Sequence, residues 1–334
     1  MKAWPGVYFP TEQNFLQCKA MDKIAFLFPG QGAQYVGMAR DIYDSYPKVK
    51  ELYLTAEKIL GCNLAKICFE GPPEVLIQTQ YTQPAIFTHS VALWRLLKKQ
   101  DIKPTFTAGH SLGEYSALVA AGALAFEDGL ETVKVRSLLM QEACEKNRGT
   151  MAAVIGLTEK DILSICREAA NYGIIQPANF NSKDQIAISG ERRAVEKGVK
   201  LAKERGAKRA ILLEVAGAFH SELMRPAQMK FKQVIDKLEV KKPQVAVVAN
   251  VNAEPTEEPS QIKELLVDQI TMPVLWYQSM ERMYKEGVRN YVEIGPGKVL
   301  QGLLKRSFKD TKGLGIDKLA DLEKFTQMVE VKAI

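Results

Sequence analysis

The segment GHSLG at residues 109–113 holds the residues of this 334-residue chain that are best suited to covalent chemistry. An apolar run at 106–109 precedes it, and residues 111–124 have the periodicity of a helix. A G-x-S-x-G pattern between a strand and a helix is typical of a nucleophile elbow, a sharp turn that exposes a serine hydroxyl. The free N–H groups at the start of such a helix face a developing oxyanion. We therefore predict that Ser111 is a nucleophile.

A serine nucleophile needs a base, and the chain has three histidines. His89 lies within an apolar helical stretch, where a packed or surface role is expected. His110 adjoins Ser111, so its side chain should diverge from the hydroxyl and at most line the mouth of the site. His220 lies in a loop after a predicted strand at 208–215, and a serine followed by a histidine is the order of α/β-hydrolases. We predict His220 as the base.

The group that orients this histidine is not evident from the sequence. Several acidic residues lie between Ser111 and His220, but none stands out, and most fall in a separate segment of the chain. They are Asp161, Asp184, Glu191 and Glu214. A backbone carbonyl is the alternative orienting group.

Arg136 is a cation among mostly apolar positions, in the segment VKVRSLLM. A guanidinium on an apolar face needs an anion, and its planar fork suits a carboxylate. A structural ion pair, or a side chain that reaches out to solvent, is an equally good interpretation of the sequence.

Two glycine-rich turns also follow apolar strands, PGQG at 29–32 and GPG at 295–297. The carboxyl ends of parallel strands share one edge of a sheet, so we expect both turns on the same rim as GHSLG. The PGQG turn either offers a second backbone N–H to an oxyanion or simply ends its strand. Neither dinucleotide nor P-loop fingerprint is present, so no nucleotide cofactor is expected.

The hydrophobic pattern places these candidates on alternating strands and helices from Met21 onward. We expect an α/β fold with an α/β-hydrolase-like, parallel-sheet large domain at 21–147 and 216–320. A ferredoxin-like (βαββαβ) small subdomain is expected as an insertion at 148–215. Residues 1–20 lack periodicity and are predicted to be an N-terminal extension or an expression remnant. The predicted strands are 24–28, 106–109, 151–157, 174–181, 185–190, 208–215, 244–251 and 291–294, and the predicted helices include 84–99, 111–124, 127–145, 158–172, 191–206, 222–238 and 260–271.

The composition excludes several classes of protein. With 46% hydrophobic and 25% charged residues, the chain is neither disordered nor fibrous nor a disulfide scaffold. No run of 18 uncharged apolar residues occurs, which excludes a membrane-spanning helix. The net charge of +6 is mild and spread along the chain, which favours an acidic partner over nucleic acid. The five scattered cysteines indicate free thiols in a reducing compartment, so we expect a cytoplasmic protein without a metal site.

From Met21 to about Arg306 the chain resembles the malonyl-CoA:acyl carrier protein transacylase family of bacterial type II fatty-acid synthesis. The resemblance spans nearly the whole chain, in the family's order. The matching stretches are FPGQGAQYVGMA (28–39), TQPAIF (82–87), AGHSLGEYSALVAAGAL (108–124), ANFNS (178–182), GAFHSELM (217–224) and EIGPGKVL (293–300).

The resemblance implies a role for each matching residue. Ser111 would be acylated with His220 as its base, and Arg136 would pair with the free malonyl carboxylate. The backbone N–H groups of Gln31 and Leu112 would donate hydrogen bonds to the oxyanion, and the backbone carbonyl of Gln269 would orient the histidine. Asn179 would lie near the site, and Phe219 would exclude α-branched acyl groups.

The implied reaction is a ping-pong transfer of malonyl from malonyl-CoA, through malonyl-serine, to the phosphopantetheine thiol of holo acyl carrier protein. No cofactor, metal, nucleic acid or membrane is implied, and we expect a monomer. Three alternatives remain open at this stage. They are a discrete trans-acting acyltransferase of a polyketide synthase, a serine thioesterase or esterase, and a catalytically silent protein that binds the carrier.

Overall fold

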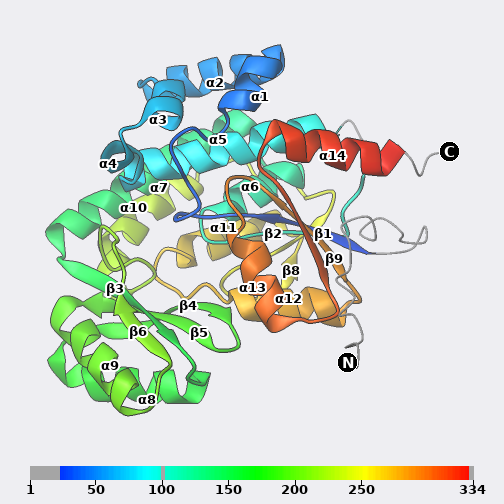
Figure 1. The fold of residues 1–334 in the computed structure, drawn as a ribbon. Helices are drawn as coiled ribbons and strands as arrows, with labels where there is room; N and C mark the ends of the chain where they lie inside the picture. Colours follow the sequence, from blue (N-terminus) through cyan, green and yellow to red (C-terminus); the bar gives the residue numbers. More distant parts are fainter. Residues whose placement is uncertain (1–22, 99–101, 331–334) are drawn as a thin grey trace, which may run out of the picture.

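The computed structural model describes residues 23–98 and 102–330, which form two β-sheets surrounded by helices (Figure 1). The predicted extension at 1–20 lies outside the described residues. Among the described helices, none combines the length and the hydropathy that a bilayer-spanning segment requires.

The larger sheet has six strands and is mostly parallel, as the sequence predicts. In spatial order they are β10 (Lys312–Ile316), β9 (Asn290–Ile294), β1 (Ile24–Phe28), β2 (Phe106–Gly109), β7 (Ala246–Val248) and β8 (Pro255–Thr256). The first five run parallel, and β8 is antiparallel to β7. The turns that follow β1, β2 and β9 therefore leave the sheet at the same edge, which is where ligands bind in open α/β sheets.

Helices cover both faces of this sheet, some of them packed on other helices and not on the strands. They are α1 (Arg40–Ser45), α2 (Pro47–Leu60), α3 (Leu64–Glu70), α4 (Pro73–Leu76), α5 (Thr79–Leu97), α6 (Gly113–Ala120), α7 (Phe126–Lys146), α10 (Arg225–Ile235), α11 (Pro259–Asp268), α12 (Trp276–Lys285), α13 (Val299–Ser307) and α14 (Leu319–Glu330). Phe26 and Phe28 of β1 pack in the hydrophobic cluster that includes α5, α6 and α7. Ala25 and Leu27 point the other way, into a cluster with α12 and α13. A strand buried on both faces has an uninterrupted apolar sequence, which makes IAFLF easy to recognise.

The smaller sheet is antiparallel and lies beside the larger one (Figure 1). Its strands, in spatial order, are β4 (Ile175–Ser182), β5 (Gln185–Glu191), β3 (Gly149–Ile155) and β6 (Arg209–Leu212), with helices α8 (Glu159–Ala169) and α9 (Arg192–Glu204). Ala152 and Val154 of β3 pack with these helices in a separate hydrophobic cluster. Met151 and Ala153 face the opposite way and line the pocket described below. One face of the small sheet therefore forms a wall of the site.

Several predicted elements differ from the observed ones at their ends. The helix expected from Ser111 begins at Gly113, because Ser111 has a left-handed backbone with φ 51°. The helix expected at 222–238 is a short 3₁₀ turn, Glu222–Met224, followed by α10. The strand expected at 244–251 is shorter in the structure and comprises only β7, Ala246–Val248.

The C-terminal elements were missed by the sequence prediction. Strand β10 has the sequence KGLGI, and its two glycines weaken the strand pattern, but it pairs in parallel with β9 along its length. Helices α12, α13 and α14 were not predicted either. The boundary expected at residue 320 falls within α14, whose Leu322 and Phe325 are buried.

Candidate active site

Ser111 lies at the end of β2 in a strained turn. Its φ of 51° is unusual for a residue with a side chain. A Cβ atom on Gly113 would lie 2.1 Å from the carbonyl oxygen of Phe28, and one on Gly109 would lie 1.9 Å from the backbone of Gly113. The two glycines therefore permit a close approach of backbone segments that no other residue allows. This geometry turns the serine hydroxyl out of the sheet edge into a pocket.

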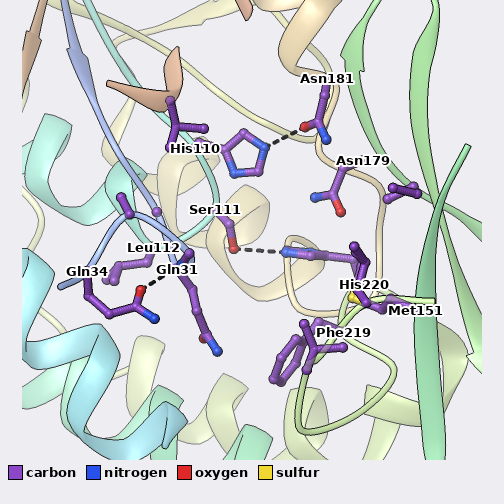
Figure 2. A pocket seen from close by; sticks show the side chains of 18 of the residues that line it. Gln31, Gln34, His110, Ser111, Leu112, Met151, Asn179, Asn181, Phe219 and His220 are labelled. Carbon is purple, nitrogen blue, oxygen red and sulfur yellow. Dashed lines mark hydrogen bonds between the residues drawn. The ribbon is translucent and has the colours of Figure 1, made fainter. Parts of the chain in front are cut away.

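His220 lies beside this hydroxyl, with its Nε2 atom 2.8 Å from Ser111 Oγ (Figure 2). Its Nδ1 atom is 2.8 Å from the backbone oxygen of Gln269. Because a carbonyl can only accept, Nδ1 carries the proton of the neutral ring and Nε2 is left to accept. Burial, with a contribution from the positive charge of Arg136, lowers the pKa of His220 to about 3. The imidazole is therefore neutral at pH 7 and able to take the serine proton.

Arg136, on α7, has its guanidinium buried at the same point. Its Nη1 atom donates to Gln83 Oε1 at 2.6 Å, and its Nη2 atom donates to Gln269 Oε1 at 2.8 Å and to Ser111 Oγ at 3.0 Å. It forms no ion pair with the described residues, and its buried Nε has no hydrogen-bond partner among them. A buried cation without a direct ion pair is costly, so this site favours a ligand with an anionic group.

Two backbone N–H groups border the serine from different strands. Gln31 follows β1 and Leu112 follows Ser111, and both line the pocket. Within the described ranges, neither N–H donates a hydrogen bond to another group. Gly30 lies against the elbow, where a Cβ atom would be 2.3 Å from the carbonyl oxygen of His110. The glycine of the PGQG turn thus allows the two strand ends to meet.

The pocket around these groups has a volume of about 320 Å³. Asn179 of β4 and Phe219, next to His220, line it together with His110 (Figure 2). The ring of His110 points away from the serine and lies 2.8 Å, through Nε2, from Asn181 Oδ1. Burial lowers the pKa of His110. The sequence-predicted residues therefore converge on one pocket. All of them except Gln269 line it, and Gln269 is buried against His220 and Arg136.

The sequence offered four acidic residues as the group that orients His220. Among the described contacts, none of them hydrogen-bonds to His220. Asp161 caps helix α8 and Asp184 accepts from Ser182. The group that does contact the imidazole is the backbone carbonyl of Gln269, the alternative that the sequence left open.

Three functional neighbours of the serine were missed. Asn250 follows β7 and brackets the elbow, accepting from Ser111 N and donating to Gly109 O, both at 2.7 Å. Gln83 on α5 holds Arg136. Glu114, three residues after the serine, accepts from Gln269 Nε2 at 2.6 Å and is 3% exposed. A carboxylate on an otherwise apolar helix was the available signal for Glu114, and a polar residue at a strand's carboxyl end was the signal for Asn250.

The third histidine, His89, lies outside this site. His89 is buried and contacts Asp317 through Nε2 at 3.0 Å, so it has a packed role. In the described part of the chain, no three or more metal-binding side chains come together.

Comparisons with known proteins give one consistent family. The family model described as an acyl transferase domain matches residues 25–326. The malonyl CoA-acyl carrier protein transacylase of Bacillus subtilis is 46% identical over 297 residues, covering 89% of this chain and 94% of the relative. That of Escherichia coli K12 is 45% identical over 287 residues, covering 86% and 93%.

Solved structures agree with this. The malonyl CoA-acyl carrier protein transacylase of Coxiella burnetii superposes with a TM-score of 0.89 at 38% identity, covering 92% of this chain and 98% of that one. A malonyl-transacylase in complex with a type II polyketide synthase acyl-carrier protein superposes with a TM-score of 0.89 at 39% identity, covering 92% and 99%.

Proposed function

This chain belongs to the acyl transferase family, among the malonyl CoA-acyl carrier protein transacylases, and we propose that it transfers malonyl from malonyl-CoA to the phosphopantetheine thiol of holo acyl carrier protein for fatty-acid biosynthesis. The observation that carries the proposal is the unpaired Arg136 guanidinium in contact with Ser111 Oγ. Malonyl has a free carboxylate that such a cation would bind, whereas acetyl has none.

In the first half-reaction, Ser111 Oγ attacks the thioester carbonyl of malonyl-CoA while its proton passes to His220 Nε2. The N–H groups of Gln31 and Leu112 stabilise the resulting oxyanion. The tetrahedral intermediate collapses, the C–S bond breaks, and His220 returns the proton to the departing thiolate of coenzyme A. The products are malonyl-Ser111 and free coenzyme A.

The second half-reaction reverses these steps with a new thiol. His220 takes the proton of the phosphopantetheine thiol, the sulfur attacks the ester carbonyl, and Ser111 leaves with the proton returned to Oγ. Arg136 holds the malonyl carboxylate throughout. Phe219, which lines the acyl pocket, limits branching next to that carboxylate.

Two other acyl-transfer functions remain as alternatives. A role with a polyketide carrier is favoured by the similar malonyl-transacylase that was solved with a type II polyketide synthase carrier. A serine thioesterase or esterase would use the same elbow with water as the acceptor, but Arg136 would then have no anionic acyl group to bind. Transfer rates to fatty-acid and polyketide carrier proteins distinguish the first alternative.

We also propose an assignment of the two domains, a cellular compartment and an oligomeric state. The large domain, 21–147 and 216–320, is α/β-hydrolase-like, and the small domain, 148–215, is ferredoxin-like, an assignment supported by the strand order β4-β5-β3-β6 and by a separate hydrophobic cluster. The protein is proposed to be a cytoplasmic monomer. Free thiols at the described cysteines support the reducing compartment, and a site formed by residues of one chain supports the monomer.

The proposal is tested by measuring the intact mass of the protein after mixing with malonyl-CoA. We expect a malonyl adduct on Ser111 that is lost when holo carrier protein is added, and no adduct on the Ser111→Ala variant. The transferase proposal fails if no adduct forms, or if the adduct discharges to water equally fast without a carrier protein.

A further inference from the structure

We propose that Glu114 is a positioning residue whose ionised carboxylate sets the orientation of the Gln269 side-chain amide, and through it the alignment of His220, Arg136 and Ser111. This inference rests on the proposed malonyl transfer. It also bears on the missing acidic third member of the triad. Glu114 is a buried carboxylate that hydrogen-bonds to Gln269, the residue whose backbone carbonyl contacts His220.

Gln269 contacts every member of the reactive group. Its backbone oxygen accepts from His220 Nδ1 at 2.8 Å, and its side-chain Oε1 accepts from Arg136 Nη2 at 2.8 Å. Its Nε2 donates to the backbone oxygen of Ser111 at 3.0 Å and to Glu114 Oε2 at 2.6 Å. The residue is fully buried. One glutamine therefore contacts the base, the cation and the nucleophile's backbone.

The orientation of this amide matters because its two ends are chemically opposite. With the amide reversed, an N–H₂ group would face the guanidinium of Arg136, a donor against donors, and an oxygen would face the Ser111 carbonyl. An ionised carboxylate only accepts, so Glu114 favours the orientation with Nε2 toward it. A protonated carboxyl or an amide at position 114 can also donate, so it no longer adds to the selection that Arg136 and the Ser111 carbonyl make.

The charges around Glu114 are few. Arg136 on α7 is the permanent charge that acts on it, and the titratable neighbour is Tyr115 on its own helix. The contacts from the segments after β7 and α11 are neutral, a backbone N–H of Asn250 at 3.3 Å and the Gln269 amide. Arg136 and Glu114 thus interact through their charges, but no direct ion pair joins them.

Burial raises the pKa of Glu114 to about 7, although its hydrogen bonds and Arg136 oppose the shift. Glu114 therefore changes charge near neutral pH, whereas His220, with a pKa of about 3, does not. The rate of Ser111 acylation should rise as pH increases through about 7, and this dependence should belong to Glu114.

The test is the single-turnover rate of Ser111 malonylation by malonyl-CoA, measured from about pH 5 to pH 9. The wild-type rate is expected to fall on the acid side of about pH 7. Glu114→Gln, which keeps the shape of the side chain, should be slower by roughly 10- to 100-fold at pH 8 and should lack this dependence. Gln269→Met retains the backbone carbonyl for His220 but has no amide, so it should lack the dependence as well.

Glu293→Gln is the matched control, because Glu293 is also a buried carboxylate with a raised pKa but, among the described residues, hydrogen-bonds only to Leu300 and Gln301. It should retain the wild-type pH dependence. Glu114 is merely structural if Glu114→Gln and Gln269→Met keep that dependence, or if the wild type has none. An absence of wild-type malonyl-Ser111 at every pH would instead overturn the proposed function.

Discussion

The Nη2 atom of Arg136 lies 3.0 Å from Oγ of Ser111, so a buried cation directly contacts the proposed nucleophile. A guanidinium can only donate, and the serine oxygen must therefore accept from it. The hydroxyl proton is left to point at His220 Nε2, 2.8 Å away. The contact thus orients the serine for deprotonation, and it places the cation within reach of an acyl group attached to that oxygen.

Arg136→Ala should reduce malonyl transfer far more than acetyl transfer, because acetyl has no carboxylate for the guanidinium to bind. Loss of a charge-assisted pair costs on the order of 2–4 kcal/mol, which corresponds to a decrease in kcat/KM of roughly 30- to 1,000-fold. The measurement is kcat/KM for malonyl-CoA and acetyl-CoA with the same carrier protein. Equal losses on both substrates would show that Arg136 acts only through Ser111 and the surrounding structure.

Gly113→Ala should strongly destabilise the protein. Its Cβ atom would lie 2.1 Å from the carbonyl oxygen of Phe28, which belongs to the central strand and cannot move away. We expect a loss of about 3 kcal/mol or more in the free energy of unfolding, measured by denaturant titration. Gly302→Ala is the matched control, since no atom lies within 4 Å of its Cβ position in helix α13. That variant should be neutral or more stable by up to about 1 kcal/mol.

Ser111→Gly should be more stable than Ser111→Ala, although both lack the nucleophile. The φ of 51° is strained for alanine and relaxed for glycine. A difference of about 1 kcal/mol in the free energy of unfolding is expected. If alanine were equally stable, the elbow would have relaxed to an ordinary backbone conformation, and the crystal structure of Ser111→Ala would show a negative φ.

Glu114→Gln should increase stability at high pH while it lowers activity. The folded-state pKa of Glu114, about 7, exceeds its ordinary value of 4.5, so the folded protein binds more protons than the unfolded chain between these values. Wild-type stability therefore falls as pH rises from about 4.5 to 7 on account of this group, and glutamine avoids the loss. The variant's advantage should grow over this window to about 3 kcal/mol at most.

This difference is measured as the free energy of unfolding of both proteins at pH 5 and pH 8. A variant that is less stable than the wild type at pH 8 would contradict the raised folded-state pKa of Glu114, because the ionised carboxylate would then stabilise the fold.

The parts of the site that could be predicted are those in which local geometry restricts residue type. The elbow needs glycine at 109 and 113 because backbone segments approach there too closely for a Cβ atom, and this requirement leaves a visible pattern. The buried strand β1 likewise shows as an apolar run. Strand β10, KGLGI, shows no such pattern. Backbone hydrogen bonds to β9 hold it in the sheet, and these bonds place little restriction on its side chains.

The amino-acid sequence by itself determined the alternation of strands and helices, the nucleophile elbow and the histidine at 220, since each depends on residues close together in the chain. Only the tertiary structure shows which groups Arg136 and Glu114 contact. A charged side chain becomes a ligand site or a positioning group through burial and through partners distant in sequence, here Gln83 on α5 and Gln269 after α11. Those partners are neutral amides with no pattern of their own, and folding alone places them beside the two buried charges.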